Sequence, residues 1–383
     1  MRFITADSIF DGEVFLSGDH AVVLEGEKIL DILPASEINV QVLERLNGIL
    51  TPGFVNAHCH LELSHLINCV PRRTGLSGFA IELMRARKSS QPEQVQQAMQ
   101  LANDFMWNNG IVLCGDISNG ADSFAIKANS AIYYHTFIEL IGLRPDAASA
   151  VFEKGKQLLK VLEKAGLAGS LAPHAPYTVS RELFTEIANY NTKHNTFLSV
   201  HNQESPEETD FFRGSGKNIR ALYTNLGIDV AWFEPSFANS FSYYFDTIKH
   251  ARSLLVHNTF TGDAELNAAR LSDVWWCFCP RANQYIENAL PELKHFMKQL
   301  HRTCIGTDSL ASNDNLDILQ EANLLLQHVS SLSTEQVLQM LTSNGAKALG
   351  QEHRFGRIQA GMAPGLNLIA EHNRNLTFVQ KVI

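Results

Sequence analysis

The sequence lacks several features that define whole classes of protein. No apolar run approaches the roughly 18 residues of a membrane-spanning helix, and the first residues show no signal-peptide pattern. Lys and Arg number 31 against 40 Asp and Glu, which gives a net charge of −9. An acidic surface argues against nucleic acid or a membrane as a partner. We therefore expect a cytoplasmic protein that binds a small-molecule substrate, with a homodimer as a possible assembly.

Cysteine is scarce, and its spacing indicates neither a disulfide framework nor a structural zinc site. Cys277 and Cys279 are separated by one residue, which is not the CxxC spacing. The sequence also contains no GxGxxG and no GxSxG, so dinucleotide-cofactor and serine-hydrolase interpretations have no motif. What remains is a chain of 383 residues, 45% hydrophobic, that can bury a large core. The six cysteines are at positions 59, 69, 114, 277, 279 and 304.

Strand-like and helix-like segments alternate along most of the chain. The intervening segments carry helical periodicity, for instance residues 152–162 and 316–326. Eight such alternations predict an α/β fold, a (β/α)8 barrel of TIM type over residues 51–354, with its active site at the C-terminal ends of the strands. The strand-like runs are residues 51–58, 111–116, 130–138, 168–174, 197–201, 253–257, 274–279 and 302–308.

The two ends of the chain have a different pattern. Short strand-like runs separated by turn residues occupy the first 50 residues, and further runs follow residue 355. We expect residues 1–50 and 355–383 to form one small β-sandwich domain beside the barrel. The expected strands are residues 14–16, 21–24, 28–33, 356–358 and 366–370.

Histidines at the ends of predicted strands are the most informative pattern. His58 and His60 close an apolar run, and alternate residues of a strand point the same way, so both can bind one metal ion. A lone HxH pair would be weak, but His201, His257 and Asp308 also end strand-like runs. Three imidazoles, from His58, His60 and His201, together with Asp308 suit Zn2+, or Fe2+ as second choice. We therefore predict a divalent metal site with these four ligands.

Such a site would perform hydrolysis. A bound ion lowers the pKa of its water from 15.7 toward about 7, which makes hydroxide available. Glu204 follows His201 by three residues, and a carboxyl group there can protonate a ring nitrogen while hydroxide attacks the neighbouring carbon. His257 could hold the hydroxide and Asp308 could accept its proton, as deamination of an aromatic amine requires. Taken alone, Glu204 would be a solvated acid at a helix start and His257 an interior histidine.

Several of these segments together resemble the amidohydrolase superfamily, and most closely its cytosine deaminase and chlorohydrolase-like branch. That branch includes the aminofutalosine, S-adenosylhomocysteine and guanine deaminases. Binuclear relatives bridge two metals with a lysine, and residues 171–174 contain none, so the resemblance implies a single metal ion. The matching segments, in order across nearly the whole chain, are residues 52–60, 174–177, 201–204, 279–283 and 306–309.

The resemblance implies a metal-dependent aminohydrolase that converts a 6-aminopurine nucleoside to the 6-oxo product and ammonia, with aminofutalosine as the favoured substrate. That substrate carries a carboxylate, which an arginine fork would match. Two alternatives stay open: a hydrolase of cyclic amides or of halogenated or aminated heterocycles, such as guanine or cytosine, and a catalytically silent barrel that serves as a binding module. The expected substrate-binding residues are Glu62, His174, Asn283 and Ser309, with Arg72, Arg73, Arg213 and Arg281 as candidates for the carboxylate.

Overall fold

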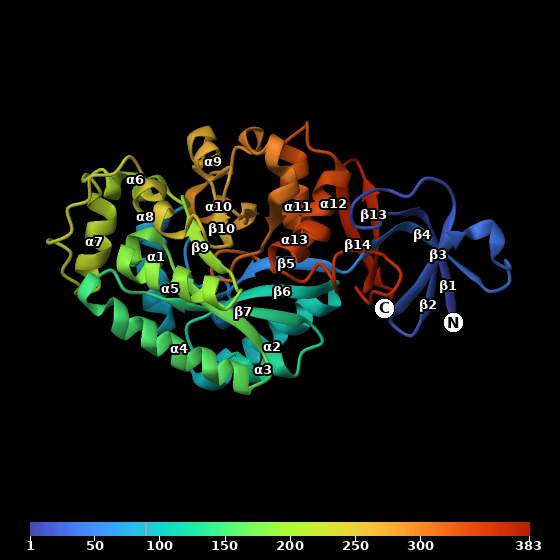
Figure 1. The fold of residues 1–383 in the computed structure, drawn as a ribbon, viewed down its shortest axis with the longest axis horizontal. Coiled ribbons are helices and arrows are strands. Elements are labelled where there is room, and N and C mark those ends of the chain that lie inside the picture. Colours follow the sequence, from blue (N-terminus) through green and yellow to red (C-terminus); the bar gives the residue numbers. More distant parts are fainter. Residues whose placement is uncertain (89) are drawn as a thin grey trace.

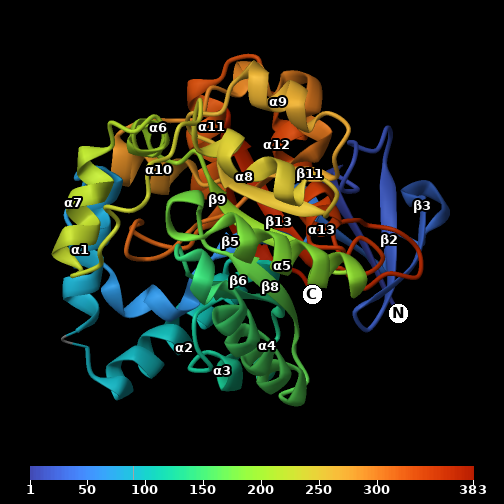
Figure 2. The same ribbon diagram turned by 60° about the vertical axis from the view of Figure 1, so that its left-hand side comes forward.

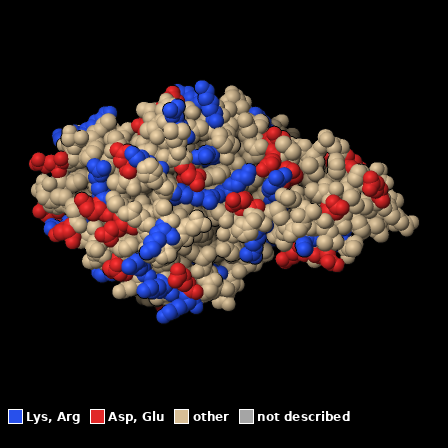
Figure 3. All heavy atoms as spheres, in the orientation of Figure 1, with Lys and Arg blue, Asp and Glu red and all other residues tan. Residues whose placement is uncertain are grey.

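The computed structural model describes residues 1–88 and 90–383 and shows two regions side by side. A large α/β region occupies most of the molecule, and a small β-rich region built from the blue N-terminal and red C-terminal segments lies at one end (Figure 1). No helix in the described ranges has both the length and the apolar character that crossing a membrane demands. On the face drawn in Figure 3, basic and acidic side chains are interspersed over the surface.

Eight parallel strands of the described chain form the large region. They belong to two four-stranded sheets, ordered β5-β6-β7-β8 and β12-β11-β10-β9. At one seam the backbone N–H of His201 donates to the carbonyl of His174 over 2.9 Å. At the other, Thr307 and Asp308 donate to the carbonyl of His58 over 3.0 and 3.1 Å. These links complete the ring, and the prediction of a TIM-type barrel is confirmed. The strands are β5 (Phe54–Cys59), β6 (Ile111–Ser118), β7 (Tyr133–Leu140), β8 (Ala168–Pro173), β9 (Leu198–Asn202), β10 (Ser253–His257), β11 (Val274–Phe278) and β12 (Thr303–Ile305).

Helices surround these strands, as Figure 2 shows. The two segments with predicted helical periodicity lie within or overlap α4 and α11. Along β11, Trp276 packs against Phe296 while Trp275 belongs to a separate apolar cluster, because alternate strand residues face opposite sides. The helices are α1 (Gly75–Arg87), α2 (Pro92–Asn108), α3 (Phe124–Ala128), α4 (Ala148–Lys164), α5 (Arg181–Lys193), α6 (Pro206–Phe212), α7 (Lys217–Asn225), α8 (Ser240–Ile248), α9 (Asp263–Ala269), α10 (Pro280–Glu287), α11 (Ile318–His328), α12 (Thr334–Leu341) and α13 (Ser343–Ala348).

The small region is one six-stranded sheet within the described chain, ordered β14-β13-β4-β1-β2-β3. We call it the terminal sheet, because strands from both ends of the chain pair in it. Its apolar residues form their own cluster, in which Ile4, Val22 and Leu50 meet Leu366. The division of the chain into two domains at residues 50 and 355 stays a prediction. The strands are β1 (Arg2–Ile9), β2 (His20–Glu25), β3 (Lys28–Pro34), β4 (Leu43–Pro52), β13 (Leu366–His372) and β14 (Asn375–Lys381).

Two strands expected in the terminal regions are wrong. Residues 14–16 contribute one isolated bridge, between Phe15 and Phe10, in place of a strand. Residues 356–358 lie in a loop, since Gly356 has a φ of +85° that a strand does not accommodate. The nearby Ile358 donates its N–H to the carbonyl of Asp11 over 2.8 Å, which ties this loop to the N-terminal segment.

Candidate active site

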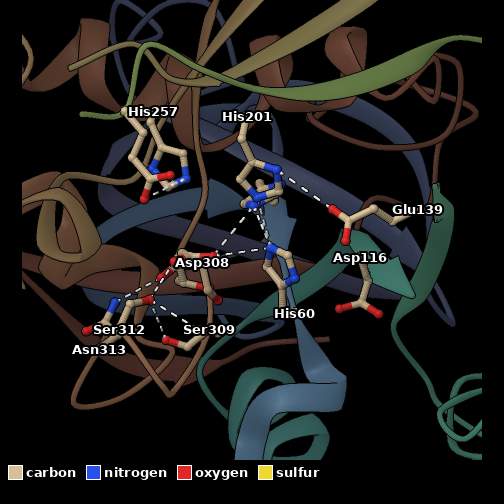
Figure 4. Close-up of polar contacts among 12 residues, drawn as sticks. His60, Asp116, Glu139, His201, His257, Asp308, Ser309, Ser312 and Asn313 are labelled. Atoms are coloured by element: carbon tan, nitrogen blue, oxygen red, sulfur yellow. Dashed lines mark hydrogen bonds and ion pairs between the residues drawn. The ribbon is translucent and has the colours of Figure 1, made fainter. Parts of the chain in front are cut away.

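The C-terminal ends of three barrel strands bring the four predicted metal ligands together (Figure 4). His58 lies in β5, His60 directly follows it, His201 lies in β9 and Asp308 follows β12. The Nε2 atom of His60 is 3.1 Å from Nε2 of His58 and 3.2 Å from Nε2 of His201. The Oδ1 atom of Asp308 is 3.4 Å from Nε2 of His60 and 3.6 Å from Nε2 of His58. We call these four residues the ligand cluster.

The spacing and chemistry of the ligand cluster fit a divalent cation. Atoms bonded at about 2.0–2.1 Å to a tetrahedral zinc ion are separated by about 3.3–3.4 Å, close to the separations measured here. The Nε2 atom of His60 faces two imidazole nitrogens and a carboxylate oxygen, and a single N–H cannot satisfy all three. Burial lowers the pKa of His60 to about 3 and that of His201 well below its usual value. Both rings are therefore neutral and able to offer lone pairs.

Neighbouring groups aim the ligands. The Nδ1–H of His201 donates to the carbonyl of His174 over 2.9 Å, which leaves Nε2 as an acceptor toward the ligand cluster. The hydroxyl of Ser312 donates to Oδ2 of Asp308, so Oδ1 is left to face the histidines. Gly306 lets β12 approach β5, because a Cβ atom there would lie 2.7 Å from the carbonyl oxygen of His58.

Glu204 and His257, the predicted acid–base pair, lie beside one another. The Oε1 atom of Glu204 is 3.6 Å from Nε2 of His257. The Nδ1–H of His257 donates to Oδ1 of Asn283 over 2.7 Å, so its Nε2 carries the lone pair. Burial raises the pKa of the Glu204 carboxyl well above its usual value, and the charges of Asp308 and Glu287 add to this. Burial lowers the pKa of His257. The geometry thus pairs a carboxyl that favours its protonated form with a neutral imidazole.

The start of α6 holds Glu204 in place. Ser205 is the N-cap of this helix, and its hydroxyl accepts the N–H of Glu207 over 3.2 Å. The Oε1 atom of Glu208 accepts the backbone N–H of Glu204 over 2.7 Å. Glu204 itself is only 4% exposed. Its side chain is therefore a buried group of the barrel mouth and not the solvated acid that its acidic neighbours could also indicate.

His174 and Asn283 were both expected to contact the substrate. The ring of His174 lies close to the ligand cluster, with its centroid 4.8 Å from that of His201, and its Nδ1 atom is 2.7 Å from the hydroxyl of Thr178. Asn283 is fully buried and its Oδ1 atom accepts from His257. The structure therefore places Asn283 behind the catalytic candidate His257, where it fixes the orientation of that ring.

Glu62 and Ser309 make contacts within the protein. The buried carboxylate of Glu62 accepts the backbone N–H of Asn119 over 3.0 Å, which attaches the segment after β5 to the segment after β6. The hydroxyl of Ser309 lies 3.2 Å from that of Ser312, next to Asp308. Ser309 is therefore close to the ligand cluster, whereas Glu62 organises the neighbouring loops.

Three of the four arginines expected to bind a substrate carboxylate have protein partners. Arg72 pairs with Asp314, and its guanidinium carbon lies 4.4 Å from the ring centroid of Tyr285. Arg281 also pairs with Asp314, over 3.1 Å. The Nε–H of Arg213 donates to a backbone carbonyl over 2.8 Å. These three partners all lie outside the ligand cluster.

Two acidic residues near the ends of β6 and β7 were missed in the sequence. Asp116, fully buried, pairs with Lys127 over 2.5 Å and accepts the backbone N–H of Leu61 over 2.7 Å, which fixes the chain just after β5. Glu139 in β7 has its Oε1 atom 3.7 Å from Nδ1 of His201. Both are acids near the end of an apolar predicted strand, so the rule that selected His201 could have found them.

Comparison with known proteins supports this picture. Residues 49–383 match the model of the amidohydrolase family. The aminodeoxyfutalosine deaminase of Deinococcus radiodurans is 25% identical, with 93% of this chain and 87% of that protein covered. The crystal structure of Helicobacter pylori aminofutalosine deaminase in complex with methylthio-coformycin superimposes with a TM-score of 0.84 at 24% identity, covering 97% of this chain and 93% of that one. A zinc-bound adenosine deaminase from Xanthomonas campestris gives a TM-score of 0.69 at 21% identity, covering 96% and 84%. The two solved structures share the fold of this chain.

Proposed function

The chain belongs to the amidohydrolase family, and from this premise we propose that it hydrolytically deaminates a 6-aminopurine nucleoside, giving the 6-oxo nucleoside and ammonia. The main support for the proposal is that the ligand cluster, Glu204 and His257 all lie at one end of the barrel. The similarity to an aminodeoxyfutalosine deaminase over nearly the whole chain supports this substrate class.

His58, His60, His201 and Asp308 would hold the divalent cation. Three imidazoles and a carboxylate are a donor set that Zn2+ accepts, and a zinc-bound structural neighbour supports that choice. When bound, the cation makes a water molecule acidic enough to ionise near neutral pH.

The protein side chains then move the protons. Asp308 accepts a proton from the attacking water, while Ser312 keeps its other oxygen fixed. His257 presents the lone pair of Nε2 to the water and orients it. The protonated carboxyl of Glu204 donates to the ring nitrogen next to the carbon that bears the amine. The carbon–oxygen bond forms, Asp308 passes its proton to the amine nitrogen, and the carbon–nitrogen bond breaks to release ammonia, while the new hydroxyl returns a proton to Glu204.

The identity of the nucleoside is the finer part of the proposal. Aminodeoxyfutalosine is the first candidate, supported by the relative that carries this name. Three of the four arginines expected to bind its carboxylate, Arg72, Arg213 and Arg281, are paired within the protein. Adenosine, 5′-methylthioadenosine and S-adenosylhomocysteine are therefore candidates beside it.

An ammonia-release screen tests the proposal. The zinc-loaded protein would be assayed on these four nucleosides and on guanine, cytosine, a cyclic amide and a chlorinated triazine, with Glu204→Gln as the blank. We expect ammonia from at least one 6-aminopurine nucleoside. Activity restricted to the other compounds would replace the proposal with the heterocycle hydrolase, and a fully loaded protein inactive on all of them would leave the binding module.

A further inference from the structure

We propose that Glu139 binds the substrate, accepting a hydrogen bond from a sugar hydroxyl of the nucleoside. This inference rests on the proposed function and names a specificity residue for it. Glu139 lies in β7, one residue before the strand ends, and its side chain is 4% exposed. In Figure 4 it lies on the side of His201 opposite Asp308, at the edge of the ligand cluster.

One oxygen of this buried carboxylate is satisfied and the other is not. The Nδ2–H of Asn119 donates to Oε2 of Glu139 over 2.8 Å, which fixes the carboxylate. The Oε1 atom has no hydrogen-bond partner among the described residues. The Nδ1 atom of His201 is 3.7 Å from Oε1, too far for a hydrogen bond, and its N–H donates to the carbonyl of His174 over 2.9 Å. A buried carboxylate oxygen without a donor costs free energy, so a ligand that supplies one would bind there.

The surroundings of Oε1 favour an organic donor over a second cation. Possible metal-ligand atoms of Glu139, His174 and His201 lie within 4.8 Å of one another, which is close enough for them to share an ion. However, one ring nitrogen of His201 faces the ligand cluster and the other is bonded to a carbonyl. The Nδ1 atom of His174 is bonded to Thr178. A second ion bound through these Nδ1 atoms would therefore have to break the hydrogen bonds that His201 and His174 make. An O–H group needs only the lone pair of Oε1.

The chemistry of a nucleoside limits what this donor can be. Adenosine has two kinds of hydrogen-bond donor: the N–H groups of the amine that leaves and the O–H groups of its sugar. Once the amine is assigned to the reaction, only the sugar hydroxyls remain as donors. A carboxylate also repels an anionic substituent held at the same position. Glu139 would therefore select a neutral, hydroxyl-bearing part of the substrate next to His174 and His201.

A cycle of substrate and protein changes tests this. The kcat/KM values of adenosine and of its 2′-, 3′- and 5′-deoxy analogues would be measured on the wild-type protein and on Glu139→Gln. We expect removal of one particular hydroxyl to lower kcat/KM about tenfold or more in the wild type, and that penalty to fall to about twofold or less in Glu139→Gln. Glu335→Gln is the matched control, because the Glu335 carboxylate likewise accepts an N–H, the backbone N–H of Phe15 over 3.3 Å, but lies on α12 beside the terminal sheet. It should keep the wild-type pattern.

Two results would overturn the inference alone. One is equal kcat/KM for all four nucleosides in the wild type. The other is a Glu139→Gln protein that loses zinc and slows on all four by the same factor, because Glu139 would then act by orienting His201. If the wild type deaminates none of the 6-aminopurine nucleosides of the ammonia-release screen, the proposed function itself fails. If Glu139→Gln does not fold, the inference is tested by inhibition of the wild type with inosine and its deoxy analogues. We expect Ki to rise about tenfold for one deoxy compound, and equal Ki values would refute the inference.

Discussion

Replacing Glu204 by Gln should remove most of the turnover and leave the cation bound. The carboxyl is 4% exposed, has Oε1 3.6 Å from Nε2 of His257, and is not one of the clustered ligands. Gln keeps the shape but cannot serve as the acid, and a general acid–base group contributes about 10²–10⁴-fold, or about 2.7–5.5 kcal/mol of barrier. Since burial already favours the uncharged carboxyl, the free energy of unfolding should change by no more than about 1 kcal/mol.

The assay combines ammonia release at saturating substrate, metal content and thermal unfolding of the same samples. Glu321→Gln is the matched control, because burial raises the pKa of Glu321 as well, to about 8, while its carboxylate accepts from Arg281 and Asn313 and has no proposed catalytic role. It should keep turnover within a few-fold of the wild type. A Glu204→Gln protein with full metal content and more than about a tenth of wild-type turnover would refute the role of Glu204 as the acid.

Three further predictions concern the metal site and the core. Gly306→Ala should weaken metal binding about 10–100-fold and lower the free energy of unfolding by about 1–3 kcal/mol, because its Cβ would lie 2.7 Å from the carbonyl oxygen of His58. Gly262→Ala is the control, since its Cβ would meet its nearest neighbour at 3.6 Å. Equal metal affinity in the two variants would contradict the argument that β12 needs a glycine to approach β5. Removal of the metal by a chelator should abolish turnover and lower the melting temperature, and divalent zinc should restore both; an unchanged melting temperature would argue that the ligand cluster holds no ion. Burial raises the folded-state pKa of Glu321 from 4.5 to about 8, so its protonated form stabilises the fold fully below the unfolded value and this contribution is lost as pH rises. In urea unfolding, the wild type should lose up to about 4 kcal/mol relative to Glu321→Gln between about pH 5 and pH 8, and parallel pH profiles would contradict this.

The barrel could be predicted because most of its strands lie in short apolar runs that end at or next to a polar residue. Several strand boundaries were misplaced by a few residues, and the start of the first barrel strand is the informative case. The apolar run of residues 49–57, which contains most of the strand predicted at 51–58, is divided in the structure: Pro52 ends β4 in the terminal sheet and β5 begins at Phe54. Both halves of the run are buried, in two different cores, so hydrophobicity alone cannot divide it.

Strand β14 was missed for the opposite reason. Most of its residues are partly or fully exposed, and only Leu376 is buried, so no alternation marks it. Its partner β13 begins with buried residues and was predicted near its observed start. The pairing of β14 with β13 cannot be predicted from the hydrophobic pattern of either segment alone.

The ligand cluster could be predicted because it needs only strand ends and alternation. The residues that support it could not, since their roles depend on which loops meet. Ser312 acts through Asp308, and Asn283 acts through His257. Arg72 and Arg281 look available in the sequence, but in the fold both reach Asp314.

The seam between β12 and β5 has a consequence for biosynthesis. The ligands come from the first, fifth and eighth strands of the ring, and His58 and Asp308 are about 250 residues apart along the chain, so joining them carries the entropic cost of closing a very long loop. A nascent chain that has not yet released Asp308 from the ribosome has two or three imidazoles and no carboxylate to complete the set. Capture of the divalent metal should therefore be among the last events of synthesis, and fragments that stop before β12 should not retain the ion.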